Sequence, residues 1–145
     1  MGRTYQSIVI NAAADCVWEA GRNFHDLGWA SRVITQVEPV GDVPGDHVGA
    51  KRVLNGSFHE TLLDVNDEER TFTYAITDGP APVSKAEVSN YVGRVRIRPI
   101  TQGSGTFVEW SSTWQRNDQA AHDFCHTIYC ALLDEMKQSL EQGRP

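Results

Sequence analysis

The segment FHETLL at residues 58–63 places two ionisable side chains side by side in a sequence typical of a strand. Successive side chains of a strand point to opposite faces, so only one of Glu60 and His59 can point into the interior. Glu60 shares a face with Phe58 and Leu62, but alternation alone does not decide between the two faces. A carboxyl group in an apolar cavity has a raised pKa, which suits a general acid or base near neutral pH.

Arg52, in the preceding predicted strand, is the candidate partner of Glu60. An arginine beside a carboxylate favours the ionised form of that carboxylate. The two residues could therefore form part of a catalytic site, or a buried or rim salt bridge with no part in catalysis. The sequence leaves both interpretations open.

His122 and His126 are four residues apart near the end of the chain, and Cys130 continues the series. This spacing can bind a metal on one face of a helix. The apolar pattern of the segment argues against a metal, because it turns His126 and then Cys130 towards solvent and leaves no obvious third ligand. We therefore predict no metal. His122 alone, near the cavity edge with Tyr129, is a candidate proton shuttle.

The longest run without Gly or Pro, Asp118 to Gln142, predicts a helix that Asn117 or Asp118 caps. Its apolar residues recur at intervals of three and four, which makes one stripe along a helix. The stripe is Ala121, Cys125, Ile128, Leu132 and Met136, with Phe124 and Tyr129 on its shoulders. No other segment is helical over a comparable length, so the surface that covers this stripe should be a sheet.

The rest of the chain predicts a strand at 4–10, short helices at 12–21 and 23–30, and six further strands. These strands are expected at 31–40, 48–54, 58–65, 70–77, 88–100 and 106–115, with a hairpin turn at Asn55-Gly56. Strands joined by hairpins form an antiparallel meander, and the last helix should lie in its concave face. The space between such a helix and sheet is usually a mostly apolar pocket with a few polar groups.

Alternation also predicts which side chains face that pocket. Arg94, Arg96 and Arg98 share one face of the 88–100 strand, which must be the outer face, so Tyr91 points inward. Aromatic residues then line the interior as candidate walls for a flat aromatic or polyene ligand. The predicted ligand-binding residues are Trp29, Phe58, Tyr74, Tyr91, Trp110, Trp114, Cys125, Ile128, Tyr129 and Leu132.

Composition limits the possible partners. The 145 residues predict one domain, 1–145, with 40% hydrophobic and 22% charged residues. A net charge of −6 argues against a nucleic-acid partner, and no apolar run is long enough for a membrane span. Three cysteines without the spacing of a disulfide framework predict reduced thiols and a cytoplasmic location. We expect a monomer or homodimer.

Several short motifs occur in this order of elements: Val17-Trp18, Phe24 with Trp29, Gly49-Ala50-Lys51-Arg52, His59-Glu60-Thr61-Leu62 and Val108-Glu109-Trp110. Together they resemble the polyketide cyclase/dehydrase branch of the START-like superfamily, called SRPBCC in bacteria, which includes the birch-pollen-allergen-like proteins. The resemblance implies an α+β helix-grip fold: a curved seven-stranded antiparallel sheet around a long C-terminal helix, with two short helices at one end. It also favours Glu60 as the residue that faces the pocket.

Two classes of function follow from the resemblance. The first is a cyclase or dehydratase that acts on a polyketide-like or other apolar aromatic substrate by general acid/base chemistry. The second is a carrier or sensor that binds a hydrophobic ligand without catalysis. The sequence contains no phosphate-binding loop, dinucleotide fingerprint or Ser-His-Asp pattern, so we expect no cofactor, and hydrolysis and hydride transfer have no support.

Overall fold

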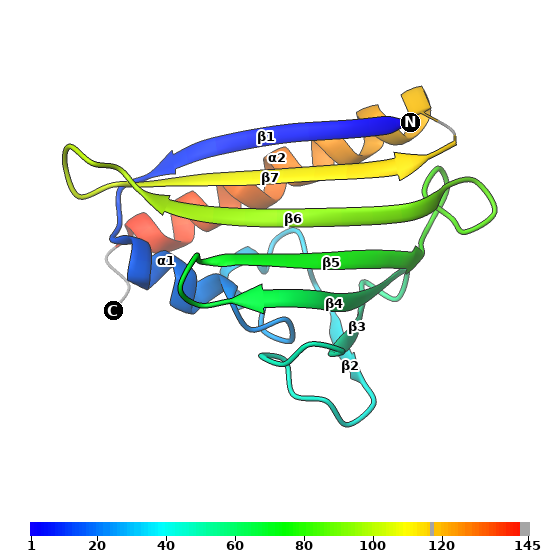
Figure 1. Cartoon of the computed structure of the whole chain (residues 1–145), viewed down its shortest axis with the longest axis horizontal. Coiled ribbons are helices and arrows are strands. Elements are labelled where there is room, and N and C mark those ends of the chain that lie inside the picture. Colours follow the sequence, from blue (N-terminus) through cyan, green and yellow to red (C-terminus); the bar gives the residue numbers. More distant parts are fainter. Residues whose placement is uncertain (117, 143–145) are drawn as a thin grey trace.

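The computed structural model describes residues 1–116 and 118–142 as a seven-stranded antiparallel sheet curved around one long helix (Figure 1). The strands lie in the order β1-β7-β6-β5-β4-β3-β2. The elements are β1 (Gly2–Ile10), α1 (Ala14–Gly21), the 3₁₀ turn η1 (Gly28–Ala30), β2 (Val37–Val40), β3 (Lys51–Leu54), β4 (Phe58–Asn66), β5 (Thr71–Asp78), β6 (Ser89–Pro99), β7 (Thr106–Gln115) and α2 (Asp118–Glu141). This architecture confirms the predicted helix-grip fold.

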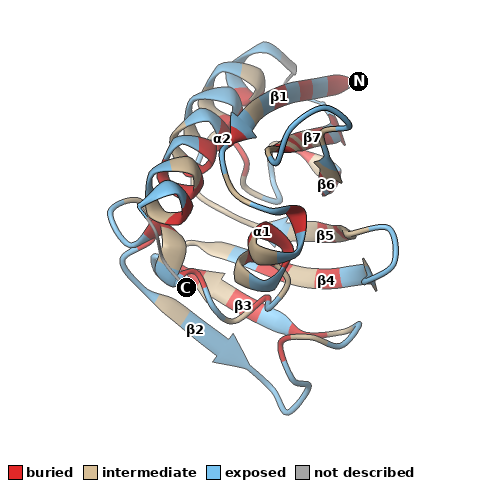
Figure 2. Cartoon of the chain, turned by 90° about the vertical axis from the view of Figure 1, so that its left-hand side faces the viewer, coloured by how far each residue is buried: buried red, intermediate tan, exposed pale blue. Residues whose placement is uncertain are grey.

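Helix α2 presents its apolar stripe to the inner face of the sheet (Figure 2). Ala121, Cys125, Leu132 and Met136 are buried, and Ile128 is half-buried. At the N-terminal end of α2, the predicted cap at Asn117 or Asp118 falls on side chains outside the described part of the chain. None of the helices in residues 1–116 and 118–142 combines the length and apolarity needed to cross a membrane.

Three predicted elements are clearly shorter than expected, among them the strand predicted at 48–54, which is reduced to β3. The helix predicted at 23–30 is reduced to η1, because side chains compete for its backbone hydrogen bonds. Asn23 Oδ1 accepts a hydrogen bond from His25 N at 2.9 Å, and Asp26 Oδ1 accepts one from Gly28 N at 3.0 Å. The prediction of two short helices is therefore correct for α1 only.

The strand predicted at 31–40 exists only as β2, because Asn55 binds the preceding segment. Its side-chain oxygen accepts hydrogen bonds from the N–H groups of Thr35 and Gln36, and its amide donates to the Val33 carbonyl. Asn55 and Gly56 have positive φ angles of 52° and 68°, as the tight β3–β4 turn requires. One turn residue thus orders the segment that leads into β2.

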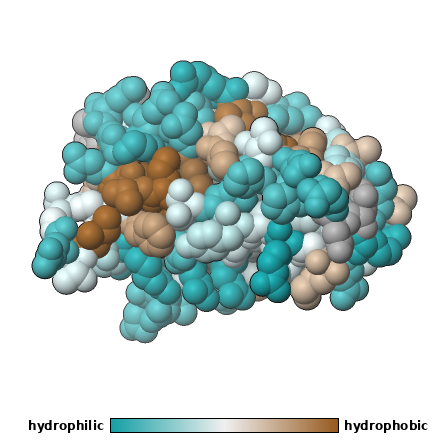
Figure 3. All heavy atoms as spheres, turned by 90° about the horizontal axis from the view of Figure 1, so that it is seen from above, coloured by the Kyte–Doolittle hydropathy of each residue, from teal (hydrophilic) through white to brown (hydrophobic). Residues whose placement is uncertain are grey.

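The outer face of the sheet is polar, as alternation predicted. Arg94 and Arg96 are exposed and Arg98 is half-buried, whereas Tyr91 on the same strand is buried against the interior. Seen from the side of β1 and α2, the surface is mostly hydrophilic and carries its largest apolar cluster towards the left-hand end (Figure 3). The aromatic residues of the sheet thus lie on its inner face, where they can line an interior site.

Gly93 is required by the close approach of an aromatic ring. It pairs with Tyr74 across β5 and β6, and an added Cβ would lie 2.3 Å from the Tyr74 ring. Gly93→Ala should therefore lower the free energy of unfolding by about 1–3 kcal/mol, because overpacking forces the ring to move. Urea unfolding measures this loss. Ser111→Ala on the outer side of β7 is the control, and an equal loss in both variants would contradict the prediction.

Candidate ligand-binding and active site

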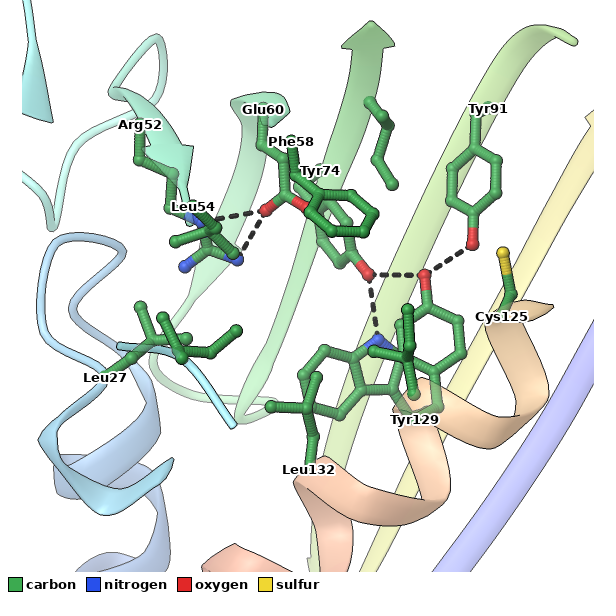
Figure 4. A pocket seen from close by; sticks show the side chains of 14 residues that line it. Leu27, Arg52, Leu54, Phe58, Glu60, Tyr74, Tyr91, Cys125, Tyr129 and Leu132 are labelled. Carbon is green, nitrogen blue, oxygen red and sulfur yellow. Dashed lines mark hydrogen bonds and ion pairs between the residues drawn. The ribbon is translucent and has the colours of Figure 1, made fainter. Parts of the chain in front are cut away.

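A cavity of about 40 Å³ lies between the inner face of the sheet and helix α2 (Figure 4). It combines apolar walls with one ion pair and a group of tyrosine hydroxyls. The lining residues are Leu27, Ile34, Arg52, Leu54, Phe58, Glu60, Tyr74, Ile76, Tyr91, Trp110, Cys125, Ile128, Tyr129 and Leu132.

The structure brings most of the predicted site residues to this cavity. Arg52 and Glu60 line it, and so do eight of the ten predicted ligand-binding residues. Trp29 and Trp114 do not. Trp29 packs against Trp110 with ring centroids 6.5 Å apart, and Trp114 stacks on Tyr91 at 5.5 Å. Both tryptophans therefore contact lining residues without lining the cavity themselves, and their contact with a ligand stays a prediction.

His122 was predicted to lie at the cavity edge, but it is not among the lining residues. It is half-exposed on α2, where Nδ1 lies 3.1 Å from Asp123 Oδ1 and the ring stacks on His126 at 5.8 Å. Within the described part of the chain, no group of three or more His, Cys, Asp or Glu side chains is arranged to hold a metal ion. The structure therefore places His122 outside the cavity lining, and its role as a proton shuttle stays a prediction.

Glu60 and Arg52 form a buried ion pair on neighbouring strands. Both Nε and a terminal nitrogen of Arg52 contact Glu60 Oε1, at 2.8 and 2.6 Å, and the two side chains are only 6% and 5% exposed. Arg52 also donates to the Phe24 carbonyl at 2.9 Å, and its guanidinium carbon lies 3.7 Å from the centre of the Phe24 ring. The guanidinium is thus fixed from three directions, and it fixes Glu60 in turn.

One oxygen of Glu60 remains free for a ligand. No described residue donates a hydrogen bond to Oε2, and Glu60 is a lining residue of the cavity. Burial raises the pKa of the Glu60 carboxyl, and the charge of Arg52 opposes that rise. His59 is exposed on the opposite face. Of the two neighbours, only Glu60 can act on a molecule in the cavity.

Three tyrosine hydroxyls meet on the side of the cavity nearest α2 (Figure 4). The Tyr129 hydroxyl lies 2.8 Å from that of Tyr74 and also contacts that of Tyr91. Trp110 Nε1 donates to the Tyr74 oxygen at 2.9 Å. Burial holds the pKa of all three phenols well above the ordinary value, so they stay protonated. This tyrosine cluster provides polar anchoring for a ligand oxygen inside an otherwise apolar wall.

Cys125 lies beside the tyrosine cluster, and its burial raises the pKa of the thiol to about 11. Cys130 is exposed on the same helix. Because the thiolate is the reactive form, Cys125 should react with iodoacetamide at pH 8 roughly 100-fold more slowly than Cys130. Its rate should rise with pH, as the thiolate fraction grows towards pH 11.

Peptide mass spectrometry of the alkylated protein measures both rates in one sample. The variant Cys130→Ser is the control that assigns the fast phase. Equal rates at the two cysteines in folded protein would mean that Cys125 is open to solvent.

Half-buried side chains mark the opening of the cavity. Phe58, Ile76 and Ile128 line it and are each partly exposed. Phe58 also stacks on Phe124 of α2, with ring centroids 6.2 Å apart and planes at 21°. Pockets for drug-sized ligands usually have volumes of about 300–1,000 Å³. An aromatic ligand therefore needs these side chains to move, and the predicted open pocket is largely filled in this structure.

The lining residues that sequence reasoning did not assign are Leu27, Ile34, Leu54 and Ile76. Ile34 belongs to the segment that was predicted as a strand, where its orientation could not be derived. Leu54 and Ile76 lie on strands whose inward faces are alternating and apolar, and that signal alone would have included them.

Comparisons with known proteins identify relatives. Residues 1–141 match the family described as polyketide cyclase/dehydrase and lipid transport. The solved structure of a protein from Nitrosospira multiformis is 40% identical with a TM-score of 0.94, over 98% of this chain and 99% of that chain. A search of curated protein sequences found no match.

More distant structures share the fold. Norcoclaurine synthase from Thalictrum flavum, solved with dopamine and hydroxybenzaldehyde, is 12% identical with a TM-score of 0.74, over 99% of this chain and 88% of that chain. Major latex-like protein 151 from Panax ginseng is 17% identical with a TM-score of 0.73, over 97% and 95%. At these identities the likeness concerns the fold alone.

Proposed function

This chain belongs to the polyketide cyclase/dehydrase and lipid transport family. From that premise we propose that it binds a polyketide-like or other apolar aromatic molecule and that Glu60 removes a proton from this molecule. The observation that carries this proposal is the free Oε2 of Glu60. Glu60 lines an apolar cavity, and its other oxygen, Oε1, holds Arg52. A fixed carboxylate with one open oxygen is the arrangement that a general base requires.

The tyrosine cluster can stabilise the negative charge that forms on the ligand when Glu60 removes a proton. Glu60 removes a proton from a carbon next to a ligand carbonyl, and the electron pair of that C–H bond moves onto the carbonyl oxygen. A neutral phenol of Tyr74, Tyr91 or Tyr129 donates a hydrogen bond to the negative charge that develops there. Cyclisation and dehydration of polyketide-like chains both begin with such a proton abstraction.

The alternative is a carrier or sensor that binds a hydrophobic ligand without catalysis. The close contacts between Arg52 and Glu60, at 2.6 and 2.8 Å, favour this alternative. In a carrier, the pair would serve only to order β3 and β4 beneath the cavity. Binding and proton transfer must therefore be measured separately.

Binding is tested with 2-tetralone, an aromatic ring fused to a ketone with acidic C–H groups. It should bind at micromolar concentration and raise the melting temperature, because a ligand that binds only the folded state stabilises that state. Thermal unfolding at increasing ligand concentration measures the shift. Ile128→Trp, which adds bulk at the opening, should reduce the shift. A melting temperature that does not respond to 2-tetralone would contradict the proposed binding.

Proton transfer is tested in D₂O with the same compound. Wild-type protein should accelerate deuterium incorporation next to the ketone, and NMR follows the loss of the proton signal. Binding without acceleration would support the carrier. Acceleration identifies the chain as a catalyst of enolisation.

A further inference from the structure

A groove of about 430 Å³ lies at the ends of β5 and β6, beside the loop 79–88. Residues 75–77 of β5, residues 88–92 around the start of β6, and Lys85 of the loop line it. Neighbouring residues of a strand point to opposite faces of the sheet. A groove lined by consecutive residues of both strands therefore lies where the sheet itself opens.

The register of the strands explains the opening. The pairing of β5 with β6 ends at Ile76 and Tyr91. Beyond this pair each strand bonds only to its other neighbour: Asp78 pairs with His59, and Ser89 pairs with Gln115. The two strands thus separate towards the loop.

The same two residues separate the groove from the cavity. Ile76 and Tyr91 line both spaces. Ile76 is half-buried, so its side chain has exposed space next to it into which it can rotate. Ile76 and Tyr91 are therefore walls common to the groove and to the cavity that holds Glu60.

Volume assigns different parts of a ligand to the two spaces. The groove, at about 430 Å³, falls within the range of about 300–1,000 Å³ that is usual for small-molecule sites, whereas the cavity holds about 40 Å³. By volume, the groove has room for the body of an aromatic ligand, whereas only a small group fits the cavity without rearrangement. Ala75, Val88 and Val92 provide apolar contact for that body.

Charge at the rim favours an anionic group. The Lys85 ammonium forms no hydrogen bond or ion pair with any residue that the structure describes. Two carboxylates lie nearby. Asp78 accepts the N–H groups of Gly79 and Lys85, and the charge of Lys85 also helps to lower the pKa of Asp78, while Glu87 accepts the hydroxyl of Ser84. Because Lys85 forms no direct ion pair with either of them, its ammonium can pair with a carboxylate or sulfonate on an apolar body.

We propose that this groove is a second ligand subsite, continuous with the cavity across the Ile76–Tyr91 pair, that binds amphipathic organic anions. The apolar body of the ligand lies along the ends of β5 and β6, its acidic group pairs with Lys85, and its other end reaches towards Glu60. This inference rests on the proposed ligand-binding function and is independent of whether Glu60 catalyses a reaction.

Two fluorescent probes test the charge. The sulfonate 8-anilinonaphthalene-1-sulfonate and the uncharged N-phenyl-1-naphthylamine share an aromatic body and differ in the anionic group. Lys85→Ala should weaken binding of the sulfonate about threefold to fivefold, as expected for an exposed ion pair, and leave binding of the uncharged probe unchanged. Lys51→Ala, an exposed lysine of β3, removes the same charge elsewhere and is the control.

A second variant tests the groove itself. Ala75→Trp fills it from β5 and should weaken binding of both probes, whereas Leu63→Trp at an exposed site of β4 should weaken neither. Amide NMR spectra of the full chain should show the largest shifts at residues 75–77 and 85–92 when the sulfonate is added. Melting temperatures of all variants confirm that they are folded.

The outcomes separate the subsite from the proposed function. Probe binding that is insensitive to Lys85→Ala and Ala75→Trp, with NMR shifts confined to residues 125–132, would overturn the groove subsite and leave the cavity as the binding site. Absence of sulfonate binding to wild-type protein would also overturn the subsite, whereas the proposed function is judged by its own assays with 2-tetralone.

Discussion

Glu60→Gln should lower the rate of deuterium exchange into 2-tetralone by about 10²–10⁴-fold while binding of the ketone changes little. Glutamine has nearly the shape of glutamate, and its side-chain oxygen can still accept the hydrogen bonds of Arg52. It cannot take up a proton near neutral pH. The loss should therefore appear in the rate at saturating ketone, measured by NMR, and hardly in the concentration needed for half-saturation.

His59→Gln is the matched control for this experiment. It makes a similar change at the adjacent position on the exposed face of β4, and the exchange rate should equal that of wild type. Both variants need to be assayed well below their melting temperatures, because the glutamine at position 60 leaves the Arg52 cation without its counter-charge. If Glu60→Gln and His59→Gln exchange at the same rate, Glu60 is not the base.

Arg52→Met should lower the free energy of unfolding by about 3–5 kcal/mol, since it leaves a buried carboxylate without its partner. The loss should be smaller at acidic pH. Without Arg52 the pKa of Glu60 rises further, because nothing then opposes the effect of burial. The folded protein binds a proton there that the unfolded protein releases, so the stability of the variant falls as pH rises. Urea unfolding at several pH values measures both effects.

Two further variants separate the ion pair from other contributions. Arg96→Met removes an exposed arginine that has no ion-pair partner in the described part of the chain, and it should change stability by no more than about 0.5 kcal/mol. The double variant Arg52→Met/Glu60→Leu replaces both charges by apolar groups and should recover most of the loss. If Arg52→Met costs no more than Arg96→Met, the pair does not contribute to stability.

The fold could be predicted because the periodic patterns in the chain are long. The apolar stripe of α2 and the arginine row of β6 each fix one face of an element over several turns or residues. The prediction of a helix at 23–30 was wrong for a local reason. Asn23 and Asp26 can bond to the backbone within two residues, and periodicity carries no information about that competition.

The site could be predicted only in part, and β4 shows why. Its register shifts between Leu62 and Asp64, so Leu63 and Asp64 are both exposed and Val65 returns to the core side. Strict alternation would have placed Val65 on the same face as His59. A bulge changes the parity of a strand, and neither its presence nor its position follows from hydrophobicity. The resemblance to a known family favoured Glu60, and the structure places it inward.

The tyrosine cluster has a further consequence that follows from counting protons. Tyr74, Tyr129 and Tyr91 carry three hydroxyl protons, but only two contacts join their oxygens. Trp110 can only donate, so it absorbs none of the three. These two contacts use two of the three protons, and the direction of the hydrogen bonds decides which phenol carries the third. When Tyr91 carries it, the neighbouring Cys125 sulfur can accept it, and when Tyr74 or Tyr129 carries it, the proton is available to a ligand. The cavity can thus present a single hydrogen-bond donor at Tyr74 or at Tyr129, which lets it meet ligand oxygens in more than one position.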